Sequence, residues 1–128
     1  MDSKQELWEK ALHKMNKEGN FKAAVLSLED GLPLVSSPAH YEDETTAAMV
    51  ALLSETVKRI NRQLHLPQLD EISIVGDDRT RLACRYFTVD DHELLLTVLA
   101  PPDQSYRRLT NRAIKEIARI WLSQRTDR

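Results

Sequence analysis

The side chains that could carry out chemistry are few and widely separated in this sequence. The single cysteine, Cys84, alternates with apolar residues, which predicts a buried, unreactive thiol rather than a nucleophile. No glycine-rich phosphate-binding loop is present, and the chain has only 3 glycines. The histidines are scattered without the spacing of a metal site: His13, His40, His65 and His92. We therefore expect no catalytic residues, no metal and no cofactor, and we expect that the protein is not an enzyme.

Two acidic pairs and one basic row have simpler explanations than ligand binding. Asp77–Asp78 and Asp90–Asp91 could hold a cation, but aspartates at such positions are typical of turns. Near the C-terminus, basic residues recur on one side of an expected helix, which favours a solvated face. They are Arg108, Arg112, Lys115 and Arg119.

Composition excludes several classes of protein. The chain has 128 residues, of which 41% are hydrophobic and 30% charged, and its net charge is −2. These values suit one domain with one modest core, and no basic excess points to nucleic acid. No apolar run approaches the roughly 20 residues that span a bilayer, and the first residues do not resemble a signal peptide. We expect a cytoplasmic protein that binds no nucleic acid and does not insert into membranes.

The longest element that could position a functional surface is a helix expected over residues 45–65. Its apolar residues recur at helical spacing, so one face should lie on a sheet. That stripe comprises Thr46, Met49, Val50, Leu53, Val57, Ile60 and Leu64.

The other sides of this helix are also unusually apolar. Ala47, Ala48, Ala51 and Leu52 occupy positions where a surface helix would carry charges. The helix could simply be buried in its own core, or it could lie between its sheet and a second subunit. We favour the second subunit, because contiguous exposed apolar surface usually marks an interface.

The segments before this helix predict a helix and a hairpin. Residues 3–6 form a capping box, an apolar stripe follows, and Gly19 is expected to end the first helix. Residues 21–28 suit a strand that is buried on both faces. Asp30–Gly31 predicts a tight turn, and residues 32–36 form the return strand. Pro33 cannot donate a ladder hydrogen bond, so the return strand should lie at an edge of the sheet.

The segments after the central helix predict three strands and a last helix. Strands over residues 69–75, 80–88 and 92–100 are joined by short turns, as in an antiparallel meander, and a helix follows over residues 105–124. The unbroken apolar run in residues 92–100 favours a central strand. The predicted fold class is α+β: a five-stranded antiparallel sheet with element order α-β-β-α-β-β-β-α. The long central helix should cover one face and the two terminal helices the other.

Three segments carry a resemblance to a known family. Residues 24–35 hold a hairpin centred on acid, Gly, Leu, Pro, Leu; residues 46–53 begin the long helix; residues 94–99 form the apolar strand. In order and spacing they resemble the roadblock/dynein light chain family. The resemblance implies a single domain over residues 1–124. The sequence itself predicts a frayed tail at residues 125–128.

The resemblance also implies a function and an assembly. Members of the family are mostly homodimers or heterodimers in which the central helices pair antiparallel and the third strands join edge to edge. Many bind or regulate small Ras-like GTPases, others are dynein light chains, and none uses a conventional active site. Carried over to this sequence, the dimer interface would comprise Ala48, Ala51, Leu52, Glu55, Arg59, Glu71, Ser73 and Val75. The partner would be a second copy or a paralogue.

Three functions remain open from the sequence. The leading one is a dimeric module that regulates or scaffolds a small Ras-like GTPase. The second is a dimeric structural adaptor without GTPase regulation. The third is a profilin-like or PAS-like small-molecule sensor, which needs a hollow between sheet and central helix. Four bulky residues are expected to fill that hollow: Met49, Leu53, Val57 and Ile60.

Overall fold

The described residues fold into three helices and five strands in the predicted order. A computed structural model describes residues 3–39, 43–65, 67 and 69–124; within these, the side chains of residues 43–51, 54 and 124 are not described. The elements are α1 (Lys4–Gly19), β1 (Ala23–Leu28), β2 (Pro33–Ser37), α2 (Asp43–Leu64), β3 (Glu71–Val75), β4 (Arg81–Val89), β5 (His92–Ala100) and α3 (Tyr106–Gln124). The predicted tail at residues 125–128 lies outside the described residues.

The strands form one antiparallel sheet in the order β2-β1-β5-β4-β3. β5 is central and β2 is an edge strand, which confirms both predictions. The β4–β5 turn places Asp90 at φ 53° and Asp91 at φ 67°, and aspartate tolerates this left-handed region better than most residues. Gly31 in the β1–β2 turn has φ 93°, as its Asp-Gly signal predicts.

The first helix begins and ends at the predicted residues, but its terminating residue is not the predicted one. Ser3 and Glu6 form the capping box, with the Glu6 amide donating to Ser3 Oγ at 3.2 Å. At the other end, the left-handed residue is Asn20, at φ 54°, and Gly19 still belongs to the helix. The predicted end of α1 at Gly19 is confirmed, but the left-handed residue that terminates the helix is Asn20 and not this glycine. A Cβ on Gly19 would lie 2.6 Å from Phe21 Cε1 and 2.7 Å from Leu109 Cδ1, so close packing requires this glycine.

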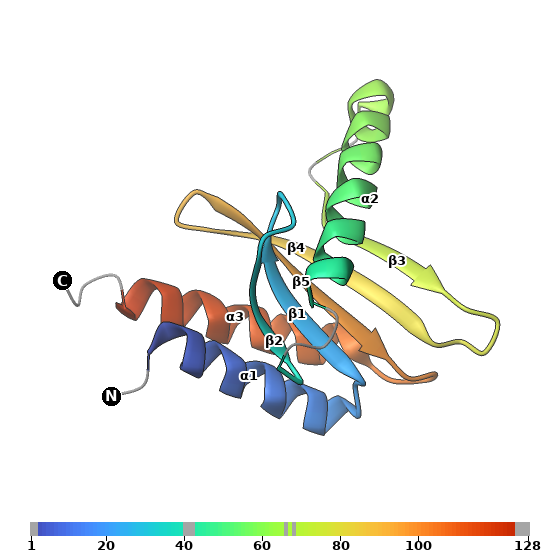
Figure 1. The fold of residues 1–128 in the computed structure, drawn as a ribbon. Helices are drawn as coiled ribbons and strands as arrows, with labels where there is room; N and C mark the ends of the chain where they lie inside the picture. The colour runs from blue at the N-terminus through green and yellow to red at the C-terminus, as the bar shows by residue number, and fades with distance from the viewer. Residues whose placement is uncertain (1–2, 40–42, 66, 68, 125–128) are drawn as a thin grey trace.

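The helices cover the two faces of the sheet as predicted. Figure 1 shows α1 and α3 side by side against one face, with α2 on the other. The main core lies beneath α1 and α3 and contains fully buried side chains from both helices and from the sheet. Among them are Leu12, Leu26, Leu94, Leu96 and Ile117.

The long helix α2 lies on the sheet over only part of its length. Its main contacts are with β1 and β2, and its C-terminal half projects beyond the sheet (Figure 1). Leu53 and Val57 are half-buried, but Ile60 is 47% and Leu64 61% exposed. The prediction that Ile60 and Leu64 pack on the sheet was therefore wrong. Helical periodicity placed them on one stripe with Leu53 and Val57, but in the described part of the chain no strand lies beneath that end of the helix.

No helix in the described part of the chain combines the length and the apolar character needed to cross a membrane.

Candidate interaction surface

Exposed apolar side chains concentrate on two elements, α2 and β3. Across the described residues, five of the seven large hydrophobic side chains that are exposed belong to these elements. They are Leu52, Ile60, Leu64, Ile74 and Val75, which we call the α2–β3 surface. Leu52 is the most exposed of them, at 69%. Leaving so many large apolar groups in water is unfavourable, so this surface is a candidate for contact with another protein.

The strand β3 also presents an open edge. It pairs with β4 on one side only, and no strand in the described part of the protomer borders its other side. Such an edge offers backbone donors and acceptors that another strand can pair with. Because side chains alternate along a strand, Ile72 and Ile74 point to the α2 side of the sheet, and Glu71, Ser73 and Val75 to the α3 side. The exposed Ile74 was absent from the predicted interface, although its alternation with Ile72 could have identified it.

The predicted interface residues divide into three groups. Leu52, Glu55 and Arg59 on α2 are exposed, as an interface that is open in the single protomer requires. Val75 is exposed at the end of β3. Glu71 and Ser73 are half-buried, and their side chains bind within their own protomer. The side chains of the remaining two, Ala48 and Ala51, lie outside the described part of the structure.

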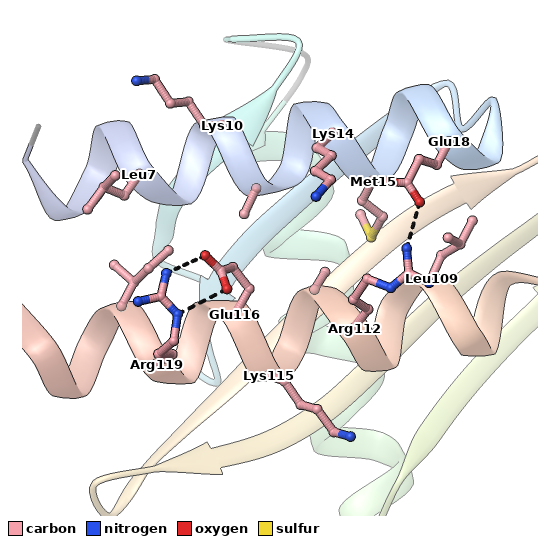
Figure 2. A pocket seen from close by; sticks show the side chains of 13 residues that line it. Leu7, Lys10, Lys14, Met15, Glu18, Leu109, Arg112, Lys115, Glu116 and Arg119 are labelled. Carbon is pink, nitrogen blue, oxygen red and sulfur yellow. Dashed lines mark hydrogen bonds and ion pairs between the residues drawn. The ribbon is translucent and has the colours of Figure 1, made fainter.

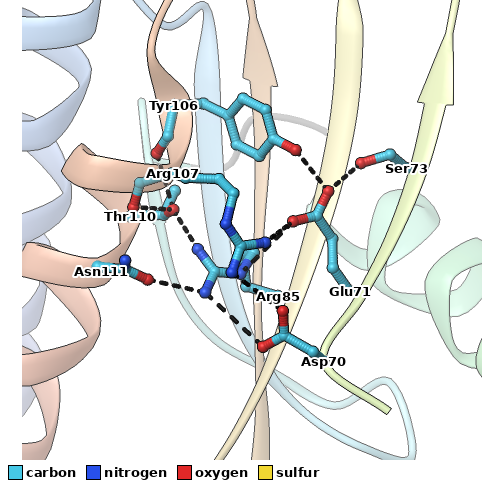
Figure 3. Close-up of polar contacts among 8 residues, drawn as sticks. All are labelled: Asp70, Glu71, Ser73, Arg85, Tyr106, Arg107, Thr110 and Asn111. Carbon is cyan, nitrogen blue, oxygen red and sulfur yellow. Dashed lines mark hydrogen bonds and ion pairs between the residues drawn. The ribbon is translucent and has the colours of Figure 1, made fainter.

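A cluster of polar side chains holds β3 against the start of α3 (Figure 3). The carboxylate of Glu71 lies at its centre. One oxygen, Oε2, accepts hydrogen bonds from the hydroxyls of Ser73 and, at 2.6 Å, Tyr106. The other oxygen, Oε1, accepts from Arg107, which also donates to Asp70 at 3.0 Å. The cluster therefore joins two segments that are more than 30 residues apart in sequence.

Arg85 on β4 lies beneath this cluster and is only 4% exposed. Its guanidinium donates to Thr110 Oγ1 at 2.6 Å and to Asn111 Oδ1 at 2.8 Å, both on α3. Its Nε has no hydrogen-bond partner and lies 3.7 Å from Glu71 Oε1. A buried cation needs a compensating charge, and the carboxylate of Glu71 provides it at close range.

The cluster shifts the pKa of Glu71. Burial by itself raises the pKa, but hydrogen bonds from Ser73 and Tyr106 and the charge of Arg107 outweigh it. The net result is a pKa below the ordinary value of 4.5. Glu71 is therefore ionised at neutral pH and ties β3 to α3. These contacts are made by side chains on the α3 face of the sheet, so they do not use the backbone groups at the outer edge of β3.

A second ionic contact connects α2 to the sheet. Lys58 Nζ lies 2.9 Å from Glu29 in the β1–β2 turn and 3.4 Å from Glu93 at the start of β5. The hydrogen bond from Lys58 lowers the pKa of Glu29, whereas burial and the neighbouring Glu29 raise the pKa of Glu93. This contact ties the C-terminal half of α2 to the β1–β2 turn and to the start of β5.

The cysteine and the histidines are the side chains that could carry out chemistry. Cys84 is 3% exposed, and burial raises the pKa of its thiol to about 11, as expected for an unreactive cysteine. His13 on α1 and His92 on β5 are exposed, His65 is exposed in the turn after α2, and His40 lies outside the described residues. Across the described residues, no group of three or more potential metal ligands lies together.

Comparison with known proteins identifies the fold. No family model matches the sequence, and no curated protein sequence does either. Solved structures, however, match along nearly the whole chain. The gliding protein MglB of Thermus thermophilus aligns with a TM-score of 0.76 and 20% identity, covering 94% of this chain and 92% of that one.

Two further structures agree. An MglB with a tetrameric arrangement aligns with a TM-score of 0.75 and 20% identity, covering 94% of this chain and 91% of that one. The Roadblock/LC7 domain from Streptomyces avermitilis aligns with a TM-score of 0.74 and 15% identity, covering 92% of this chain and 98% of that one. The chain therefore has the roadblock/LC7 fold, which confirms the fold that the sequence resemblance implied.

Proposed function

We propose that this chain is the protomer of a dimeric, non-catalytic interaction module that regulates or scaffolds a small Ras-like GTPase. The observation that carries the proposal is the α2–β3 surface, where an apolar helix and an open strand edge are left exposed. The shared fold with MglB and a Roadblock/LC7 domain supports it, since members of the resembled family act in this way.

In the proposed dimer, the α2 helices of two copies pack against each other and their β3 strands pair edge to edge. Pairing would satisfy the outer backbone groups of β3 and cover its exposed Ile74. It would also cover Leu52. The cluster around Glu71 supports this role, because it fixes β3 on α3 and presents the edge in a defined position. Fixed elements lose less conformational entropy when they associate.

The non-catalytic part of the proposal rests on the chemistry of the described side chains. The one thiol is buried with a raised pKa, and the described histidines belong to no group of three or more potential metal ligands. The protein would therefore act by binding and reshaping a GTPase, which itself contains the groups that hydrolyse GTP.

The experiment is a binding assay with purified Ras-like GTPases of the source organism, each loaded with GDP or with a non-hydrolysable GTP analogue. The proposal predicts that at least one GTPase binds, with preference for the triphosphate form. Equal binding of both forms would instead identify a structural adaptor. If no GTPase binds in either form, the GTPase part of the proposal is wrong. A parallel incubation of this protein alone with GTP should release no phosphate.

A further inference from the structure

The outer surface of α1 and α3 contains a groove that the proposed function does not use. The two helices run antiparallel, and the groove between them has a volume of about 560 Å³ (Figure 2). Its apolar lining comes from both helices and includes two alanines, whose short side chains widen the groove. The six apolar lining residues are Leu7, Ala11, Met15, Leu109, Ala113 and Ile120.

The rim of the groove is strongly basic. Five basic residues line it, against two acidic residues, Glu18 and Glu116. The basic residues are Lys10, Lys14, Arg112, Lys115 and Arg119. The groove thus carries an excess of three positive charges in a chain whose net charge is −2. A local charge of this sign, around an apolar floor, favours an acidic and apolar binding partner.

The acidic residues of the rim already have partners inside the protein. Arg112 donates to Glu18 across the groove at 2.8 Å, and Arg119 donates to Glu116 at 3.1 Å and 2.5 Å. These contacts are visible as dashed lines in Figure 2. Each ion pair engages one arginine as well as one glutamate, so the excess of three positive charges on the rim corresponds to its three lysines.

We propose that this groove binds an amphipathic α-helix of a partner protein, with an apolar stripe flanked by acidic residues. The lining extends along α1 from Leu7 to Glu18, which is about 17 Å or three helical turns at 1.5 Å per residue. Apolar residues at i, i+3, i+4 and i+7 of the partner helix would fill the groove. Acidic residues on either side of that stripe would reach Lys14 on one wall and Lys115 on the other.

The inference goes beyond the proposed function and uses the opposite side of the molecule. The groove lies on the helical layer formed by α1 and α3, whereas the α2–β3 surface includes the helix on the other face of the sheet (Figure 1). A dimer formed through α2 and β3 would therefore leave both grooves open. Each dimer would present two equivalent helix-binding grooves, and simultaneous use of both would raise the overall affinity.

The test uses a fluorescently labelled helical peptide of about 18 residues, long enough for a stable amphipathic stripe when bound. It carries leucines at i, i+3, i+4 and i+7 and glutamates on both flanks. A matched peptide keeps the leucines and replaces every flanking glutamate with lysine. Binding is measured by fluorescence anisotropy against the full chain at low and at high salt. The proposal predicts that the glutamate peptide binds, that the lysine peptide does not, and that added salt weakens binding.

Two charge reversals locate the site. In the double variant Lys14→Glu/Lys115→Glu, the dissociation constant of the glutamate peptide should rise by about tenfold or more. Lys22→Glu reverses one charge at an exposed lysine outside the groove and should have little effect. Leu52→Arg, on the α2–β3 surface, should leave the intrinsic affinity of each groove unchanged. A failure of the proposed dimer is thus distinguishable from a failure of the groove.

Three results would overturn the inference. The first is equal binding of the glutamate and lysine peptides. The second is an equal loss of affinity in the groove variant and in Lys22→Glu. The third is binding of phosphatidylserine vesicles, lost in the groove variant, together with no binding of the glutamate peptide. That result would assign the basic rim to a membrane surface.

Discussion

Substituting Glu71→Gln tests how the edge strand β3 is held in place. The change preserves the shape of the side chain and an oxygen that can still accept from Tyr106, but it removes the charge that faces Arg85 and Arg107. Arg85 is buried, and its nearest remaining carboxylate is Asp70, at 3.8 Å and with a side chain that is 63% exposed. The free energy of unfolding should therefore be lower in this variant than in the parent protein.

The expected decrease in the free energy of unfolding lies between two limits. A hydrogen bond to a charged group contributes about 1.5–3 kcal/mol, and breaking a fully buried ion pair costs about 3–5 kcal/mol. The Glu71 side chain is 14% exposed and Arg107 is 48% exposed, so water partly screens the cluster. We expect Glu71→Gln to lower the free energy of unfolding by about 2 kcal/mol.

The assay is urea unfolding near pH 7, with Glu18→Gln as the matched control. Glu18 also bridges an arginine, Arg112, but on the surface, where side chains are 35% and 54% exposed. Such a pair contributes only about 0–1 kcal/mol. Both variants are made in the Leu52→Arg background and compared at one protomer concentration, so that association does not enter the difference. If Glu71→Gln lowers the free energy of unfolding no more than Glu18→Gln does, the reasoning is refuted.

The pH dependence gives a second check. The folded-state pKa of Glu71 is lowered, so its contribution is present above the ordinary pKa of 4.5 and is lost as pH falls through the folded-state value. The glutamine variant has no such group. The difference in unfolding free energy between the parent protein and Glu71→Gln should therefore be largest near neutral pH and shrink in acid.

Three further predictions concern packing, the position of α2 and the buried thiol. Gly19→Ala should destabilise the protein by about 1–3 kcal/mol in thermal unfolding, because the new Cβ meets Phe21 and Leu109. This clash should outweigh the better helix propensity of alanine. An unchanged melting temperature would contradict the prediction. Lys58→Met removes the ionic contact between α2 and the sheet. Amide hydrogen exchange in residues 59–64 should therefore accelerate, while exchange in β5 stays unchanged. Unaltered exchange in residues 59–64 would refute this role of Lys58. Cys84 should react with a thiol reagent near pH 8 only after unfolding, because at a pKa of about 11 roughly one thiol in a thousand is ionised there; rapid labelling of the native protein would contradict its burial.

The sequence predicted those features that depend on local patterns. Turn chemistry located Gly31 and the Asp90–Asp91 turn, and the apolar run of residues 92–100 identified the central strand with its observed bounds. Pro33 correctly indicated an edge strand. In each case the signal comes from a few neighbouring residues, whose backbone preferences or hydrogen-bonding capacity suffice to decide the structure.

Features that depend on distant partners could not be predicted in this way. Helical periodicity shows which side of α2 carries Ile60 and Leu64, but not that the sheet ends before it reaches them. The cluster of Glu71, Arg85 and Arg107 depends on the register of β3 against β4 and on the docking of α3. No spacing in the sequence encodes that arrangement. The groove between α1 and α3 likewise arises from the packing of two helices at opposite ends of the chain.

The central claim is that the α2–β3 surface pairs two copies of this chain, and sedimentation equilibrium tests it most directly. Burying a leucine side chain contributes about 1.5–3 kcal/mol, and a symmetric dimer would lose that contribution twice in Leu52→Arg. Leu122→Arg, a change at an exposed leucine on α3, is the matched control. The account predicts about twice the protomer mass of 14.7 kDa for the parent protein and for Leu122→Arg, and the protomer mass for Leu52→Arg. A parent protein that stays at 14.7 kDa at high concentration, or a Leu52→Arg variant that remains dimeric, would contradict it.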